Sequence, residues 1–247
     1  MPRRFFVPPG AVRGKSVTIT GSDVHHIGTV LRLSVGDEIE VVDEGGRAYL
    51  VELISFEADK IAGRVTRTLE SGVREPTVSL FQGVPKGRKM NYLVRGAVEA
   101  GADSIVPVVM ARTVPELRGE KAVRRGDRWR RIAAEAAKQA RRERPISVHG
   151  PVSFDEALNM LKGCDAVLVF WEGERERLPS DVLKPDVGSV GAVVGPEGGL
   201  AEEELKALEE IGGMPVTMGE SILRTETAGV VACAIIRYEL MRLRRGQ

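Results

Sequence analysis

Two glycine-containing stretches in the C-terminal third carry the residues best suited to hold a ligand. The first, the glycine loop, reads Gly-Pro-Glu-Gly-Gly-Leu over residues 195–200 and follows an apolar run over 190–194. Its glycines allow a ligand to approach the backbone closely, although an ordinary strand-to-helix turn has the same composition. Glu197 is either a proton acceptor or a brace that accepts backbone N–H bonds. The candidate ligand-binding residues here are Gly195, Pro196, Glu197, Gly198, Gly199 and Leu200.

The carboxylates that follow the glycine loop narrow the class of ligand. Glu202, Glu203 and Glu204 open the next expected helix, where they favour the positive end of the helix dipole. They also repel phosphate from the place where the phosphate of a nucleotide normally lies. This favours a ligand without phosphate and with a positive charge, such as S-adenosylmethionine, over ATP or NAD. No Gly-x-Gly-x-x-Gly fingerprint follows any expected strand, which agrees with this preference.

The second stretch reads Met-Gly-Glu-Ser-Ile-Leu-Arg-Thr-Glu-Thr-Ala over residues 218–228 and also lies between an expected strand and helix. Arg224 can turn its guanidinium into a cleft, or it can form a surface ion pair with Glu220 or Glu226. The candidate ligand-binding residues of this stretch are Met218, Gly219, Ile222, Leu223, Arg224, Thr225, Thr227 and Ala228, together with Phe170 and Trp171 at the end of an earlier apolar run.

The elements that must position these stretches alternate between strand and helix. Apolar runs predict strands over residues 78–84, 104–109, 166–171, 190–194 and 215–218. Helical spacing predicts helices that include residues 90–97, 129–140, 205–211 and 228–240. Such alternation is typical of a parallel α/β sheet, in which ligands bind at the carboxyl ends of the strands. Residues 228–236 are apolar nearly all round, so the last helix must be covered on both sides, which a subunit interface could provide.

The first 70 residues follow a different pattern. Strands are expected over residues 16–20, 38–42, 48–54 and 61–66, and one helical stripe runs from Val24 to Leu31. Several short strands with one helix predict a small β-barrel. Residues 70–76 form the expected linker, so the predicted domains are residues 1–73 and 74–247.

Composition sets limits on partners and location. The chain has 247 residues, of which 43% are apolar, and no apolar run approaches the ~20 residues of a membrane helix. The N-terminus lacks the apolar segment of a secretory signal. The two cysteines are expected to be thiols in a reducing cytosol, which predicts a cytoplasmic protein without membrane attachment. Three histidines and two cysteines form no recognisable metal-binding set, so no metal is expected.

Charge is distributed unevenly along the chain. Residues 112–144 contain twelve basic and five acidic side chains, which indicates either a polyanion-binding face or a solvated helix face. Arg131, Glu135, Lys138 and Arg142 fall on one expected helical stripe. The candidate contacts to a polyanion are Arg3, Arg4, Arg32, Lys86, Arg88, Lys89, Arg131, Lys138 and Arg142.

The glycine loop and the residues Ile-Leu-Arg-Thr-Glu-Thr-Ala at 222–228 together resemble the paired signature of the bacterial 16S rRNA (uracil-N3) methyltransferases, the RsmE family of the SPOUT superfamily. The similarity covers essentially the whole chain. It includes Arg-Phe-Phe-Val at 4–7, His-His-Ile at 25–27, Gln-Gly at 82–83 and Glu-Ala-Ala-Lys-Gln at 135–139. Where the family usually has Thr-Glu-Leu-Gly, this chain has Val-Glu-Ala-Gly at 98–101.

The resemblance implies a PUA-like RNA-binding barrel followed by a SPOUT domain with a C-terminal trefoil knot. It further implies S-adenosylmethionine as cofactor, a homodimer formed through the SPOUT domain, and methylation of N3 of one uridine in the 16S rRNA of the small ribosomal subunit. In that reaction Arg224 would stabilise the negative charge of the uracil. The alternatives are a SPOUT methyltransferase that acts on another rRNA or tRNA nucleotide and a non-catalytic RNA-binding assembly factor.

Overall fold

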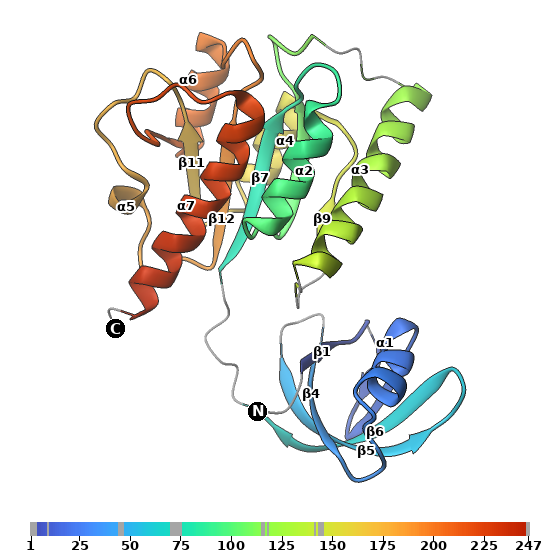
Figure 1. The fold of residues 1–247 in the computed structure, drawn as a ribbon. Helices are drawn as coiled ribbons and strands as arrows, with labels where there is room; N and C mark the ends of the chain where they lie inside the picture. Colours follow the sequence, from blue (N-terminus) through green and yellow to red (C-terminus); the bar gives the residue numbers. More distant parts are fainter. Residues whose placement is uncertain are drawn as a thin grey trace. The chain divides into compact units, whose positions relative to one another are not determined.

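The protein is described here by a computed structural model (Figure 1). The described residues are 4–8, 10–43, 47–69, 76–114, 117, 119–140, 142 and 146–245. The chain divides into two compact units, residues 1–74 and residues 75–247. Within the described ranges, no helix combines the length and the apolar character that crossing a membrane requires.

The second unit is built on a parallel sheet, as the alternation of strands and helices predicts. Its strand order is β10-β8-β7-β12-β11-β13, with β9 beside β8, and all the recorded pairings are parallel. The strands are β7 (Thr77–Gly83), β8 (Ser104–Val109), β9 (Ser147–Val148), β10 (Val152–Ser153), β11 (Ala166–Phe170), β12 (Ser189–Val194) and β13 (Met214–Val216). The helices are α2 (Lys89–Glu99), α3 (Gly119–Gln139), α4 (Phe154–Leu161), α5 (Pro179–Val182), α6 (Glu202–Glu210) and α7 (Thr225–Arg245).

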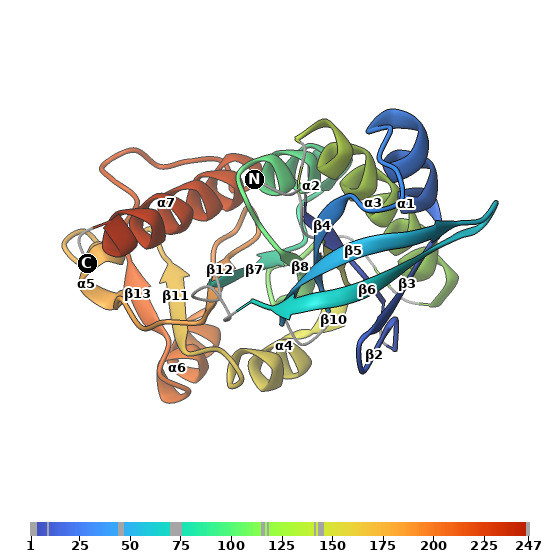
Figure 2. The ribbon, with the colours of Figure 1, turned by 90° about the horizontal axis from the view of Figure 1, so that it is seen from below.

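Helices cover both faces of this sheet, with α2, α3 and α7 on one side and α4 and α6 on the other (Figure 2). Because successive side chains of a strand point to opposite faces, each central strand contributes to two cores. In β12, Ala192 and Val194 pack under α2 and α7, whereas Val193 packs toward α4 and α6. Burial on both faces is the reason why these strands are continuous apolar runs.

Several elements of this unit differ from the predicted ones: β9, β10 and α5 were not expected, and three further differences have a physical reason. Helix α4 was not expected, although Ser153 and Glu156 form a capping box: the Glu156 carboxylate accepts a bond from the Ser153 backbone N–H at 2.7 Å. Strand β13 ends at Val216 rather than 218, because the Thr217 N–H donates to the Arg177 carbonyl outside the sheet. Helix α3 ends at Gln139, so the expected helical stripe that included Arg142 is wrong.

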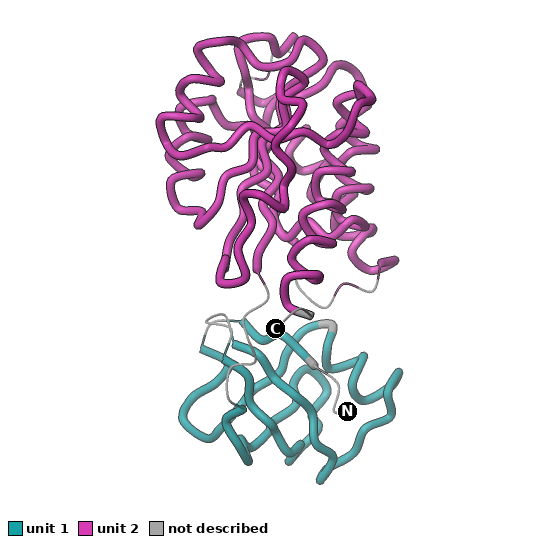
Figure 3. Tube along the Cα trace, turned by 90° about the vertical axis from the view of Figure 1, so that its left-hand side faces the viewer, with its two compact units in different colours: residues 1–74 teal, residues 75–247 magenta. Residues whose placement is uncertain are grey.

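The first unit is a curled, six-stranded mixed sheet around one apolar core (teal in Figure 3). Its order is β1-β4-β5-β6-β3-β2, and β1 pairs with β4 in parallel while the other neighbours are antiparallel. Within the described part of this unit no pairing joins β1 to β2, so the sheet retains two edges. The strands are β1 (Arg4–Phe6), β2 (Val12–Arg13), β3 (Ser16–Thr20), β4 (Glu38–Val42), β5 (Ala48–Phe56) and β6 (Lys60–Thr68). The expected linker residues 70–75 lie outside the described residues.

The expected helical stripe of the first unit forms α1 (Ser22–His25) and a π-helical turn, η1 (His26–Val30). The turn closes with a bond from the Leu31 N–H to the His26 carbonyl at 2.9 Å. Arg32 follows with a φ of 54°, the positive-φ region that residues other than glycine rarely adopt.

Candidate functional site

A pocket of about 980 Å³ lies at the carboxyl ends of the adjacent strands β12, β11 and β13. Three loops form it: the glycine loop after β12, the arginine loop (residues 217–224) after β13, and the acidic loop (residues 171–178) after β11. All three loops reach the same edge because the strands are parallel, which is where open α/β sheets bind ligands. The volume suits a cofactor-sized ligand.

Most residues expected to bind a ligand line this one pocket. They are Phe170, Trp171, Gly195, Pro196, Glu197, Gly199, Met218, Gly219, Ile222, Leu223, Arg224, Thr225 and Ala228. Three others do not line it. Gly198 turns toward Arg112, whose guanidinium donates to the Gly198 carbonyl at 2.7 Å; Leu200 is buried in the core beside α4 and α6; and Thr227 is exposed on α7.

Two glycines, one in the glycine loop and one in the strand beside it, have no room for a side chain. Gly199 has a φ of +72°, and a Cβ there would meet the carboxylate of Glu172 from the acidic loop. A Cβ on Gly83, at the end of β7, would meet the ring of Pro196 at 2.5 Å. The backbone of the glycine loop therefore lies directly against both the acidic loop and β7.

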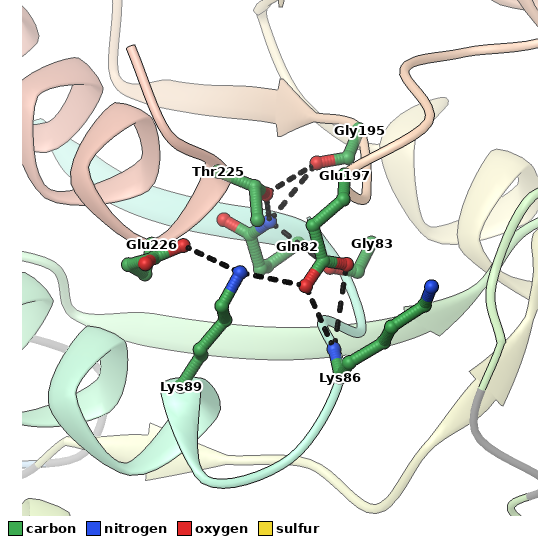
Figure 4. A network of polar contacts seen from close by, with 8 residues as sticks. All are labelled: Gln82, Gly83, Lys86, Lys89, Gly195, Glu197, Thr225 and Glu226. Atoms are coloured by element: carbon green, nitrogen blue, oxygen red, sulfur yellow. Dashed lines mark hydrogen bonds and ion pairs between the residues drawn. The ribbon is translucent and has the colours of Figure 1, made fainter.

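A buried amide joins the glycine loop to the start of α7, the residue directly after the arginine loop (Figure 4). Gln82 of β7 is fully buried, and its Nε2 donates to the Gly195 carbonyl at 3.3 Å and to the Thr225 hydroxyl at 2.9 Å. The Thr225 hydroxyl in turn donates to the Gly195 carbonyl at 2.6 Å. Thr225 thus holds the glycine loop to the start of α7, in addition to lining the pocket.

Glu197 is held by donors on both of its oxygens. The Lys86 backbone N–H lies 3.1 Å from Oε1 and 3.3 Å from Oε2, and the Lys89 ammonium lies 2.9 Å from Oε1. Partial burial acts to raise the pKa of Glu197, but the hydrogen bonds from Lys89 and backbone N–H groups and the charge of Lys89 outweigh it, so the pKa lies below its ordinary value. This geometry favours the brace over the proton acceptor, because a carboxylate with lowered pKa is a weak base.

Arg224 is exposed and lines the pocket. In the part of the chain that the structure describes, no carboxylate pairs with its guanidinium, and Glu226 pairs with Lys89 at 3.5 Å instead. The ion pair of Arg224 with Glu220 or Glu226 is therefore not formed. Its charge remains available to a ligand.

The carboxylates that face the pocket are not the three that the sequence singled out. Glu202, Glu203 and Glu204 do not line it, and Glu204 is buried, where it accepts the Ala111 and Ala201 N–H groups at 2.8 and 2.9 Å. These three carboxylates therefore do not repel phosphate from the pocket, and the expectation that they do is wrong. The acidic residues of the lining are Glu172, Glu174, Glu197, Glu220 and Glu226.

The acidic loop was missed in the sequence apart from its first residue, Trp171. It contributes Glu172, Glu174, Arg175 and Leu178 to the lining. Glu174 accepts three consecutive backbone N–H groups, from Arg175 to Arg177, and so shapes the loop. Its position directly after an expected parallel strand could have predicted this loop as part of the site, because the same position identified the other two loops.

The residues expected to contact a polyanion differ in their exposure and in their ion pairs. Arg32, Lys86, Arg88, Arg131 and Lys138 are exposed. Lys89 lies in the pocket between two carboxylates. Arg142 is largely buried, with its guanidinium 2.7 Å from Asp103, so it does not extend the surface stripe. Arg3 and the side chain of Arg4 lie outside the described residues.

Comparison with known families identifies the class of protein. A family model described as an RNA methyltransferase domain matches residues 73–237, and one described as an RNA methyltransferase PUA domain matches residues 19–65. The first covers the parallel sheet and the whole pocket, and the second covers most of the curled sheet. The chain is thus a member of the RNA methyltransferases that carry a PUA domain.

Individual relatives make the assignment narrower. The Bacillus subtilis ribosomal RNA small subunit methyltransferase E is 35% identical over 93% of this chain and 93% of its own. The Mycobacterium bovis protein of the same name is 32% identical over 94% of this chain and 90% of its own. The chain belongs to the ribosomal RNA small subunit methyltransferase E family.

One solved structure is also informative about the ligand. The Neisseria gonorrhoeae ribosomal RNA small subunit methyltransferase E, solved bound to S-adenosyl methionine, is 27% identical with a TM-score of 0.64. It covers 96% of this chain and 98% of its own.

Proposed function

We propose that this protein transfers a methyl group from S-adenosylmethionine to N3 of one uridine in the 16S rRNA of the small ribosomal subunit. Membership of the family supports the reaction class. The observation that carries the proposal is the pocket between the glycine loop and the arginine loop. Arg224 brings to it a positive charge that no carboxylate of the described residues pairs.

The residues of the pocket fit this cofactor. Phe170, Trp171 and Leu223 provide apolar walls for an adenosine, and Gly195 and Gly199 line the pocket with backbone alone. Glu172 presents a carboxylate beside Gly199 that complements a cationic ligand. When bound, the cofactor supplies an electrophilic methyl group on a positively charged sulfur.

The chain must then make N3 of uridine reactive. N3 carries a proton and lies on the pairing edge, so the base has to be unpaired or flipped out to reach a pocket. N3 loses this proton to solvent, which spreads negative charge onto the ring carbonyls, and we assign the stabilisation of that charge to Arg224. Methyl transfer to N3 would leave S-adenosylhomocysteine as the second product. Glu197 acts in this scheme as the brace of the glycine loop rather than as the proton acceptor.

We propose that RNA is held by the first unit and by exposed cations of the second. The match to a PUA model supports the first part. The exposure of Arg131 and Lys138 on α3 and of Lys86 and Arg88 before α2 supports the second, because phosphate contacts position RNA without reading its sequence. We expect the protein to act in the cytoplasm, where ribosomal subunits assemble.

We also propose a trefoil knot and a homodimer. Strand β13 lies at one edge of the sheet, yet the chain then returns to its middle, where α7 packs on β7 and β12, and this path supports a threaded C-terminal segment. Large apolar side chains are exposed on α7 and on α2 beside it, among them Tyr92 at 71% and Tyr238 at 63%. A second copy of the chain would cover them.

The decisive experiment is methylation of small ribosomal subunits from cells that lack this protein. The purified protein and labelled S-adenosylmethionine should yield 3-methyluridine at one position of 16S rRNA, identified by mass spectrometry of nucleosides and fragments. Methylation of another nucleotide would identify the protein as a methyltransferase with a different target. Binding of both cofactor and RNA without any transfer would identify a non-catalytic assembly factor.

A further inference from the structure

Lys89 occupies a central position among the segments that form the pocket (Figure 4). It is the first residue of α2, and its ammonium lies 2.9 Å from Glu197 Oε1 and 3.5 Å from Glu226 Oε2. Glu197 belongs to the glycine loop, and Glu226 belongs to the first turn of α7, two residues after Arg224. Among the residues that the structure describes, no other ion pair joins these two segments.

The two carboxylates need this cation. The side chain of Glu226 is 19% exposed, and its Oε2 is buried without a hydrogen bond, so removal of Lys89 would leave a partly desolvated charge without a partner. The hydrogen bond to Glu197 raises the pKa of Lys89, and the charge of Glu226 adds to this effect, so the ammonium stays protonated. With two negative charges beside one positive charge, Lys89 is a poor ligand for a phosphate group.

We propose that Lys89 is a positioning residue for methyl transfer: it ties the glycine loop to the start of α7 and thereby sets where Arg224 stands relative to the bound cofactor. This inference rests on the proposed function. It replaces the expectation that Lys89 contacts RNA phosphate.

The test compares four variants of the full chain: Lys89→Met, Lys89→Arg, Glu226→Gln and the double variant Lys89→Met/Glu226→Gln. Arg95→Met is the matched control, because Arg95 is an exposed cation of the same helix without a recorded partner among the described residues. Single-turnover methylation of small ribosomal subunits is measured at saturating cofactor and subunit. Calorimetry with S-adenosylhomocysteine gives the cofactor Kd.

Lys89→Met should slow the methylation step by about ten- to a hundredfold, because a displacement of about 1 Å at a reacting centre has an effect of this size. Its cofactor Kd should stay within about threefold of the parent, since the backbone and the apolar walls hold the cofactor. Lys89→Arg should recover most of the rate, because a guanidinium can also bridge two carboxylates. The rate of the double variant should lie within a few-fold of the rate of Lys89→Met, because both changes break the same network of charges.

Hydrogen exchange of the cofactor-free protein tests the bridge without activity. The Lys86 amide, which donates to Glu197, should exchange faster in Lys89→Met and in Glu226→Gln than in the parent or in Arg95→Met. This comparison stands even if the parent methylates another nucleotide, so failure of the bridge and failure of the proposed function are distinguishable.

Three outcomes would overturn the inference. One is a methylation rate of Lys89→Met within twofold of the parent. Another is a loss of cofactor affinity that accounts for the whole loss of rate, which would make Lys89 a cofactor ligand. The last is a fall of about one in the slope of log RNA affinity against log salt for Lys89→Met alone, which would make Lys89 a phosphate contact. If Lys89→Met does not fold, Glu226→Gln decides by the criteria for rate and cofactor affinity, with Lys89→Arg as the variant that should retain most of the parent rate.

Discussion

Arg224 shows how a residue type and a position together suggest a role. Its guanidinium is exposed in the pocket, and neither of the expected carboxylate partners reaches it. Arg224→Ala should lower single-turnover methylation by two to three orders of magnitude, because loss of one preorganised donor to a developing oxyanion costs about 3–4 kcal/mol. Arg224→Lys should restore part of the rate, since a point charge cannot reproduce the planar fork. The cofactor Kd is the internal control, and a rate within a few-fold of the parent would contradict the assignment.

Asp103 illustrates a charge whose role is structural. Its carboxylate accepts bonds from the Val78 N–H at 2.9 Å, from Arg142 at 2.7 Å and from Arg237 of α7. Asp103→Asn should lower the free energy of unfolding by about 3 kcal/mol, because two largely buried guanidinium groups would lose their counter-charge. Urea unfolding measures this. Glu120→Gln breaks the exposed pair with Arg124 and should cost less than about 0.5 kcal/mol, so equal losses would contradict the prediction.

At the scale of elements, two adjacent glycines of the glycine loop have different surroundings and should respond differently to substitution. Gly199→Val should weaken binding of S-adenosylhomocysteine at least about tenfold, because its φ is positive and a side chain would displace Glu172. Gly198→Ala should leave the affinity within about threefold, since its Cβ meets only the flexible side chain of Arg112, at 3.2 Å. Calorimetry on both variants decides. A larger loss of affinity for Gly198→Ala than for Gly199→Val would contradict the prediction, because it would indicate that the ligand contacts Gly198 rather than Gly199.

The second prediction at this scale concerns Arg32, in the turn after η1. Arg32 adopts a φ of 54°, which disfavours an L side chain. Arg32→Gly should therefore stabilise the first unit by about 0.5–1 kcal/mol, and it should weaken RNA binding and lower its salt slope by about one if Arg32 contacts a phosphate. Thermal unfolding and filter binding at several salt concentrations measure the two effects. Unchanged RNA binding would leave Arg32 without a role in recognition.

At the scale of the whole molecule, the exposed apolar residues of α7 bear on assembly. Tyr238→Glu should convert the proposed dimer to a monomer, because a buried unpaired charge in an interface is costly. Light scattering coupled to size exclusion measures the mass, and circular dichroism checks that the fold persists. Ile54→Glu, a change of an exposed apolar residue of β5 in the first unit, is the control and should leave the mass unchanged. A parent that is itself monomeric would refute the dimer.

The sequence by itself determined the parallel sheet and most of the lining of the pocket. Apolar runs and helical spacing are local properties, so they can be read along the chain, and parallel strands necessarily deliver their carboxyl ends to one edge. That geometry brought the glycine loop and the arginine loop together. The same rule applied to the strand that ends at Phe170 would also have identified the acidic loop.

Tertiary structure alone decided which charges meet. Arg142 and Lys89 look like surface cations in the sequence, yet one pairs with Asp103 and the other bridges Glu197 and Glu226. Glu204 looks like a solvated acid but is buried as a hydrogen-bond acceptor. Apart from Ala201, which is three residues from Glu204, these partners lie far apart along the chain, 108 positions in the case of Lys89 and Glu197. The strength of an ionic contact depends on distance and solvent exposure, and both are properties of how the elements pack rather than of any local pattern.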